Sequence, residues 1–141
     1  MPSRITLTKL ADENHAVHTI EGGRRSHRRR PCGGCPWLVQ NIGGFPAEAF
    51  RLSANTAYDA SLHQFACHES GLDKPATCAG FLLRNAYNNI GTRLAAMRDE
   101  IDFSTLEDPG DALFASYREM AVANGVFPDD PVLAPCGANF E

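Results

Sequence analysis

The sequence contains no long apolar run, and this absence excludes a membrane-spanning helix. None of its 141 residues belongs to a stretch approaching the roughly 18 apolar residues that such a helix requires. The first fifteen residues, MPSRITLTKLADENH, also lack the unbroken apolar segment of a secretion signal. We therefore expect a protein that stays in the cytoplasm.

Several catalytic motifs are absent as well. The chain has no G-x-x-x-x-G-K-[ST] for phosphate binding, no G-x-S-x-G for a nucleophilic serine and no H-E-x-x-H for a metalloprotease. A second C-x2-C pair, which most structural zinc sites use, is also missing. These absences favour a role that is not enzymatic.

The five cysteines are the chemically informative residues that remain. In a reducing compartment an odd number of cysteines favours metal ligation, catalysis or simple burial over disulfides. Four of them form the pattern C-x2-C-x31-C-x10-C. A C-x2-C turn places two sulfurs on the same side, and two further thiolates complete a four-ligand site. The sequence therefore predicts one metal site at Cys32, Cys35, Cys67 and Cys78.

An alternative for the two isolated cysteines is that they are small buried apolar residues. The predicted position of Cys78 in the first turn of a helix favours the metal interpretation, because the helix dipole stabilises a thiolate there. His68 and Cys136 are alternate ligands. Neighbouring residues in extended chain point to opposite sides, so His68 suits a hydrogen bond to a sulfur, and Cys136 is interpreted as a spare thiol.

The presence of only one C-x2-C turn, the knuckle Cys32–Cys35, helps to decide which metal is bound. Ligands that come one at a time from separate segments suit an iron–sulfur cluster, whose corners are spread more widely than the ligands of one ion. Four cysteines predict the [4Fe-4S] type. Apolar residues beside the cysteines, such as Trp37, Phe65 and Phe81, are able to exclude water from a cluster. Zn²⁺ is the alternative cofactor, since the same residues also suit an ordinary core.

Charge is distributed unevenly along the chain. Residues 1–51 carry eight Lys or Arg against four Asp or Glu, or +4, whereas residues 52–141 carry five against thirteen, or −8. The basic excess includes an arginine arm directly before the first cysteine, formed by Arg24, Arg25, Arg28, Arg29 and Arg30. This arm is a candidate contact for nucleic acid or an acidic protein surface. The alternative is a solvated arm that pairs with the acidic part of its own chain.

Apolar periodicity, together with helix-capping and helix-breaking residues, predicts a mainly α-helical single domain. A small α+β fold is the alternative. We expect short strands at residues 4–10 and 16–20 and helices at about 46–60, 77–100 and 109–124. For the last helix we predict Asp108 as N-cap, Gly125 just past the end, and a buried stripe of Leu113, Tyr117, Met120 and Ala121. The longest helix is predicted from Leu83, Tyr87, Ile90, Leu94, Met97 and Ile101, which recur every three or four residues. The domain is expected to be organised around the four-cysteine metal site. Its parts are an N-terminal segment (1–23), the basic arm (24–30), a metal-centred helical core (31–126) and an irregular proline-rich tail (127–141).

The blocks RRPCGGCPW, FPAEAF, TAYD, FACHESG and PATCAGFLL resemble a family of small cysteine-rich proteins of unknown function from bacteriophages and actinobacteria. The resemblance covers residues 28–98. It implies a common site at the same four cysteines and a bacterial or phage-infected cell as the setting. It implies no activity.

Three functions follow from these observations. The first is an iron–sulfur protein acting as a regulator or accessory factor, with the arginine arm contacting nucleic acid or an acidic partner. The second is a structural zinc module for protein–protein contact. The third is a thiol oxidoreductase that uses Cys32 and Cys35, although such sites normally follow a strand and open a helix, whereas here Pro31 and Pro36 flank the pair.

Overall fold

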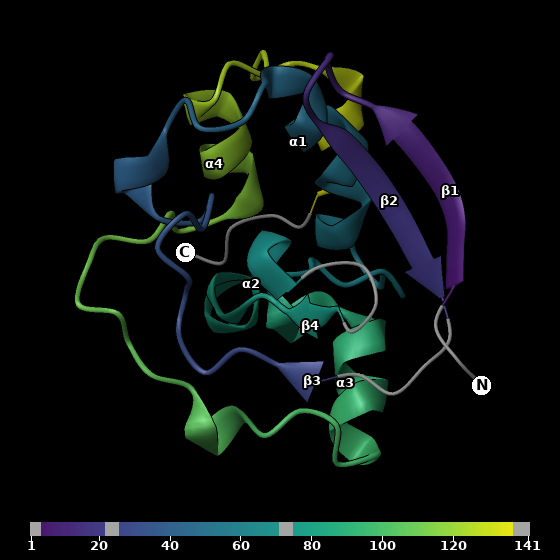
Figure 1. The fold of residues 1–141 in the computed structure, drawn as a ribbon, viewed down its shortest axis with the longest axis vertical. Coiled ribbons are helices and arrows are strands. Elements are labelled where there is room, and N and C mark those ends of the chain that lie inside the picture. Colours follow the sequence, from purple (N-terminus) through teal and green to yellow (C-terminus); the bar gives the residue numbers. More distant parts are fainter. Residues whose placement is uncertain (1–3, 22–25, 71–74, 137–141) are drawn as a thin grey trace.

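The computed structural model describes residues 4–21, 26–70 and 75–136. Its helices are α1 (Ala47–Ser53), α2 (Ala79–Arg84), α3 (Ile90–Met97) and α4 (Tyr117–Ala123). Its strands are β1 (Arg4–Leu10), β2 (Ala16–Glu21), β3 (Ser26–His27) and β4 (Ala76–Thr77). Figure 1 shows α2 and β4 at the middle of the molecule, with α1 and α4 towards one end and α3 towards the other. No helix in these three ranges has the length and apolar character needed to cross a membrane.

The N-terminal strands were predicted nearly to the residue. β1 and β2 form an antiparallel hairpin in which Arg4 pairs with Glu21 and Leu10 with Ala16. A register shift between Ile5 and Leu7 interrupts the ladder, and such a bulge on an edge strand discourages pairing with other chains. The hairpin lies beside α1, as Figure 1 shows.

The expected fold class was wrong. The described residues form an α+β fold, with two small sheets and four helices of only six to eight residues. Nor is this fold organised around a metal site. Among the described residues no group of three or more His, Cys, Asp or Glu side chains is arranged to hold a metal ion. An aromatic and aliphatic core performs that organising role instead.

The long helix predicted at residues 77–100 is broken in the middle. α2 ends at Arg84, a single 3-10 turn follows at Ala86–Asn88, and α3 starts afresh at Ile90. Asn89 causes the new start, because its fully buried side chain accepts a hydrogen bond from the Thr92 N–H and donates to the carbonyl oxygens of Thr56 and His63. The interruption also leaves much of the predicted buried stripe exposed, with Met97 81 % accessible.

The last helix is shorter than predicted but buries the expected residues. It is capped by Ser116, whose hydroxyl accepts from the Glu119 N–H at 3.1 Å, and not by Asp108, whose carboxylate accepts instead from the Gly110 N–H. Tyr117 and Met120 are buried, as the stripe predicted. The helix therefore begins later because the serine offers a cap next to the apolar residues.

Trp37 lies at the centre of the core. Its indole is fully buried and packs edge-on against Phe65, Phe81 and Tyr117, with ring centroids 6.0–6.4 Å apart. Edge-to-face pairs of this kind contribute about 0.5–1.5 kcal/mol each beyond the area they bury. The core therefore joins segments that are as much as 80 residues apart in the chain, Trp37 to Tyr117.

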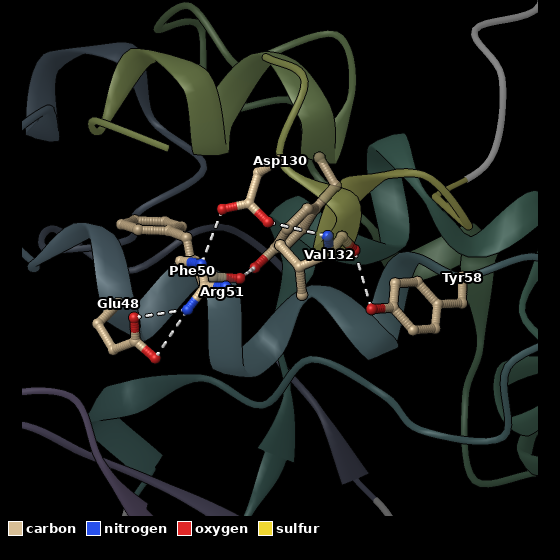
Figure 2. Close-up of polar contacts among 7 residues, drawn as sticks. Glu48, Phe50, Arg51, Tyr58, Asp130 and Val132 are labelled. Carbon is tan, nitrogen blue, oxygen red and sulfur yellow. Dashed lines mark hydrogen bonds and ion pairs between the residues drawn. The ribbon is translucent and has the colours of Figure 1, made fainter. Parts of the chain in front are cut away.

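The segment after α4 packs against α1. Leu133 is fully buried in a 3-10 turn at Pro131–Leu133, so this part of the predicted irregular tail belongs to the core. Figure 2 shows Arg51 of α1 between two carboxylates, donating to Asp130 at 2.8 Å and to Glu48 at 3.0 Å. The Tyr58 hydroxyl donates to the Val132 carbonyl oxygen at 2.8 Å. These contacts fix the chain end beside α1.

The Arg51–Asp130 pair predicts a loss of stability in acid. The hydrogen bond from Arg51 lowers the pKa of Asp130 below its usual 3.8, so the pair stabilises the fold above that pH and the contribution disappears as pH falls through the lowered pKa. We expect Asp130→Asn to lower the thermal midpoint at pH 7 and to match the unsubstituted protein near pH 2. Thermal unfolding over this pH range measures it. The exposed neighbour serves as control: Asp129→Asn should track the unsubstituted protein throughout.

Candidate thiol site

The site begins with the C-G-G-C turn. The Cys35 N–H donates to the Cys32 carbonyl oxygen at 3.0 Å, which closes the turn. The side chain of Asn41 then clamps it, donating from Nδ2 to the carbonyl oxygens of Gly33 at 2.9 Å and Cys35 at 2.8 Å. A single amide therefore holds the backbone of the knuckle in one shape.

A short ladder places the other two cysteines. β4 lies between β3, which it pairs in parallel, and the segment around Ala66, which pairs antiparallel with Thr77. The Cys67 N–H donates to the Ala76 carbonyl oxygen at 2.7 Å, and the Cys78 N–H donates to the Phe65 carbonyl oxygen at 2.9 Å. Alternation along the two segments puts Cys67 and Cys78 on the same face.

The four cysteines form two pairs, each between separate segments. Cys35 Sγ lies 3.5 Å from Cys78 Sγ, and Cys67 is the neighbouring cysteine that helps to raise the pKa of the Cys32 thiol. None of the five cysteines forms a disulfide. A common site for these four cysteines stays a prediction, and the close partners are not the two members of the C-x2-C motif.

Within the buried pair the two thiols have opposite pKa shifts. The hydrogen bond from Cys78 lowers the pKa of Cys35, aided by the Trp37 and Leu38 N–H groups. The same bond, together with burial, raises the pKa of Cys78 well above its usual value. The helix-start amides of Gly80 and Phe81 act in the predicted direction on Cys78 but are outweighed. The thiolate-stabilising position is therefore Cys35 and not Cys78.

Cys32 is the member of the set that solvent reaches. It is half-buried, whereas the exposed fractions of Cys35, Cys67 and Cys78 are 0 %, 4 % and 3 %. Burial, followed by the neighbouring Cys67, raises the pKa of Cys32 to about 12. A reagent from solution therefore meets the site first at Cys32.

Gly80 lets α2 approach the knuckle closely. A Cβ at this position would stand 2.6 Å from Cβ of Trp37 and 3.4 Å from Sγ of Cys35. Asn41 and Gly80 are site-building residues that the sequence reasoning missed. An asparagine six residues after Cys35 and a glycine two after Cys78 carry no general motif, so only the tertiary contacts identify them.

The clamp by Asn41 gives a prediction of its own. Asn41→Asp keeps the shape of the side chain but turns a carboxylate towards two carbonyl oxygens, so both hydrogen bonds are lost. We expect a loss of about 1–3 kcal/mol in the free energy of unfolding. Urea unfolding checks it, with the same amide-to-acid change at the exposed neighbour, Gln40→Glu, as the matched control. Equal stability of the two variants would show that the clamp contributes nothing.

The two alternate ligands have different outcomes. Cys136 is buried, donates a weak hydrogen bond to the Ala54 carbonyl oxygen at 3.8 Å and pairs with Tyr58 in a β-bridge. Burial raises its pKa to about 11. Its role as a spare thiol stays a prediction. The backbone of His68 belongs to a 3-10 turn at His68–Ser70, and its side chain lies outside what the structure describes.

The arginine arm runs directly into the site. Arg24 and Arg25 lie outside the described residues, and Arg28, Arg29 and Arg30 are exposed. The Arg28 N–H donates to the Thr77 carbonyl oxygen, next to Cys78. The Arg29 carbonyl oxygen accepts from the Glu107 N–H at 2.7 Å. Within the described part of the chain none of the three exposed guanidinium groups forms an ion pair within 4.0 Å.

Two open cavities lie elsewhere on the described surface. One, of about 270 Å³, is lined by Lys9, Glu48, Arg51, Leu52, Asn55, Tyr58 and Val132. The other, of about 490 Å³, is lined by residues 99 and 101–104. Neither lining includes a cysteine, and Arg51 in the first is already paired with two carboxylates.

Comparison with known protein families identifies the family to which the chain belongs. The model of DUF6283, a family of unknown function, matches residues 27–137, so the chain belongs to that family. The matched range contains all five cysteines and the three described arginines of the arm, and it excludes the β1–β2 hairpin. Searches of curated proteins and of solved structures give no match.

Proposed function

For this member of a family of unknown function, we propose a non-enzymatic metal–thiolate protein, a regulator or accessory factor whose Cys32, Cys35, Cys67 and Cys78 hold an iron–sulfur cluster. One observation carries the proposal. Four thiols from three separate segments form two pairs, and the Sγ atoms of the buried pair, Cys35 and Cys78, lie 3.5 Å apart near Trp37. A cluster accepts thiolates of this kind from separate elements.

The surroundings of the thiols support a cluster. Phe65 and Phe81 stack on one another with centroids 6.4 Å apart, and both contact Trp37. Such an apolar shell keeps water from a cluster and raises its stability. A [4Fe-4S] centre offers one corner to each of the four thiolates, and binding it requires Cys35 Sγ and Cys78 Sγ to move apart from 3.5 Å. Zn²⁺ bound by four thiolates is the alternative, since tetrahedral Zn–S bonds of ≈ 2.3 Å place the sulfurs about 3.8 Å apart.

The oxidoreductase hypothesis has less support. A C-x2-C redox site exchanges disulfides with a substrate through an exposed first cysteine and a nearby second one. Here Cys35 is fully buried and its close partner is Cys78. The geometry therefore favours ligation over dithiol exchange with another protein.

The arginine arm supplies the proposed partner contact. Arg28, Arg29 and Arg30 are exposed, and the backbone of the arm is bonded to Thr77 beside Cys78. Order at the thiol site is thus linked to the position of the basic side chains. We infer that they contact nucleic acid, in the cytoplasm of a bacterial or phage-infected cell, where reduced thiols are available for metal binding.

The deciding experiment is a visible spectrum of protein purified without oxygen, with iron, sulfide and zinc measured on the same sample. A brown protein with about four iron and four sulfide per chain is the expected result. A colourless protein with one tightly held zinc would replace the cluster with the structural zinc module. Protein purified without any metal, and unable to take up iron and sulfide, would refute ligation altogether.

The arm gives a quantitative prediction for nucleic-acid binding. Replacing Arg28, Arg29 and Arg30 together by glutamine should reduce the slope of log K against log salt by about 3, because each phosphate contact contributes roughly 0.9. Fluorescence anisotropy with a mixed-sequence DNA duplex at several salt concentrations measures it. The matched control replaces three exposed arginines elsewhere, Arg84, Arg93 and Arg98, and should leave the slope unchanged. Metal content should be the same in both variants.

A further inference from the structure

We propose that the site is also a modification site for hydroperoxides, which convert its metal-free form into a state with two disulfides, Cys32–Cys67 and Cys35–Cys78. The inference rests on the proposed function in one respect, that metal release is what exposes the thiols to oxidation. Both bonds join separate segments, and neither is the C-x2-C bond that the sequence motif suggests.

The buried pair is already close to bonding distance. Cys35 Sγ and Cys78 Sγ are 3.5 Å apart, and a disulfide needs them at about 2.05 Å. The backbone around both residues is fixed, by the Asn41 clamp on one side and by the hydrogen bond between Cys78 and Phe65 on the other. Closing the bond therefore requires small side-chain rotations and leaves the ladder and the turn in place.

The second pair contains the accessible sulfur. Cys32 is half-buried, and its neighbour Cys67 is 4 % exposed. Cys32 reacts as its thiolate, a small fraction at neutral pH because its pKa is raised to about 12. This thiolate attacks one oxygen of a hydroperoxide ROOH, the O–O bond breaks, and with one proton taken up the products are the sulfenic acid Cys32–SOH and ROH. The Cys67 thiol then attacks this sulfur, the S–S bond forms, and the oxygen leaves as water. Cysteine loses two electrons in total, and the peroxide O–O bond accepts them.

The Cys35–Cys78 bond forms from a second equivalent of peroxide by the same two steps. Both sulfurs are nearly inaccessible, so this second oxidation requires local opening of the site and is slower than the first. After both steps no thiolate remains to ligate metal. The oxidised state and the metal-bound state are therefore mutually exclusive, and peroxide controls the exchange between them.

The experiment uses metal-free full-length chain carrying Cys136→Ser, treated with hydrogen peroxide. Intact mass should fall by two hydrogen atoms and then, more slowly, by two more. Cleavage after Arg51 separates the knuckle from the other two cysteines, and cleavage after Glu69 separates Cys67 from Cys78. The fragment that contains Cys67 should become disulfide-linked to the knuckle peptide in the fast phase. The fragment that contains Cys78 should become linked to it in the slow phase. A knuckle peptide that carries an internal Cys32–Cys35 bond and links to neither would overturn the proposal.

Paired variants test the connectivity directly. The variant Cys35→Ser with Cys78→Ser retains Cys32 and Cys67, and the variant Cys67→Ser with Cys78→Ser retains the C-x2-C pair. We expect the first to form its disulfide at least about tenfold faster, since Cys67 is the cysteine that most affects Cys32 and a disulfide forms only between sulfurs that can approach closely. Equal rates, or a faster C-x2-C pair, would contradict it. Tryptophan fluorescence establishes that each variant is folded, and the fragment linkage in the four-cysteine chain decides the matter if one is not.

The outcomes of this experiment distinguish failure of the disulfide proposal from failure of the proposed metal binding. Cross-segment disulfides in a chain that takes up no metal would leave the oxidation proposal standing and refute ligation. A brown protein whose metal-free form yields only the Cys32–Cys35 bond would support metal ligation and refute the proposed disulfides.

Discussion

Replacing Cys78 by serine is expected to abolish metal binding and to destabilise the fold. The hydroxyl is a poor ligand for the proposed centre, and a site that binds metal only in the folded state adds its binding free energy to stability. With free metal a thousandfold above the Kd, this term is about 4 kcal/mol. For a chain of this length it corresponds to a thermal midpoint lower by roughly 8–16 °C. Metal analysis and calorimetry measure the two effects, and the same result is expected at Cys32, Cys35 and Cys67.

The matched control is the fifth cysteine. Cys136 is as buried as Cys78, with exposed fractions of 5 % and 3 %, but its thiol contacts the Ala54 carbonyl oxygen and not another sulfur. Cys136→Ser should keep the full metal content and change stability by about 1 kcal/mol, the usual size of one hydrogen bond. Retention of metal in Cys78→Ser, or its loss in Cys136→Ser, would refute the ligand set.

Gly80→Ala is expected to damage the site without touching a cysteine. The new methyl group would stand 2.6 Å from Cβ of Trp37 and 3.0 Å from Cγ, and both atoms belong to the fixed base of a fully buried side chain. Relief requires α2 to move away from the knuckle, which separates Cys78 from Cys35. We expect a loss of about 1–3 kcal/mol in the free energy of unfolding, the normal cost of overpacking. Metal content should fall as well.

Gly33 offers the same substitution without the clash. It lies within the C-G-G-C turn, and a Cβ built there meets no atom within 4 Å. Gly33→Ala should therefore fold with unchanged stability and full metal content, as urea unfolding and metal analysis would show. If both glycine variants behaved alike, close approach of α2 to Trp37 would not be what holds the two sulfurs together.

Short-range patterns predicted the parts of this protein that depend on neighbouring residues. Alternation predicted the strands at the N-terminus, and β1 and β2 occupy almost those ranges. The stripe containing Tyr117 and Met120 is buried as predicted, and Gly125, with a φ of 107°, ends α4. In each case the deciding interaction is local, because it involves residues two to four positions apart.

The prediction of one long helix was wrong because the residues that interrupt the helix interact with distant parts of the chain, which local sequence patterns do not reveal. Its apolar period continues across Asn89, but the buried Asn89 side chain finds partners on Thr56 and His63, more than 25 residues away. Those hydrogen bonds favour a new helix start over continuation of the old one. The fold class was wrong for the same reason, since tertiary contacts converted one long helix into two short ones.

The candidate site also has features that the sequence spacing predicts and others that only the tertiary structure reveals. The spacing of the cysteines, C-x2-C-x31-C-x10-C, is by itself the source of the prediction that four of them form one site, with the two partners of the C-x2-C pair coming from elsewhere in the chain. Only the tertiary structure decided which sulfur faces which, because the pairs Cys35–Cys78 and Cys32–Cys67 depend on the β4 ladder, the Asn41 clamp and the missing side chain at Gly80. Each of these is a contact between distant segments, and sulfur positions vary by ångströms with contacts that sequence spacing does not encode.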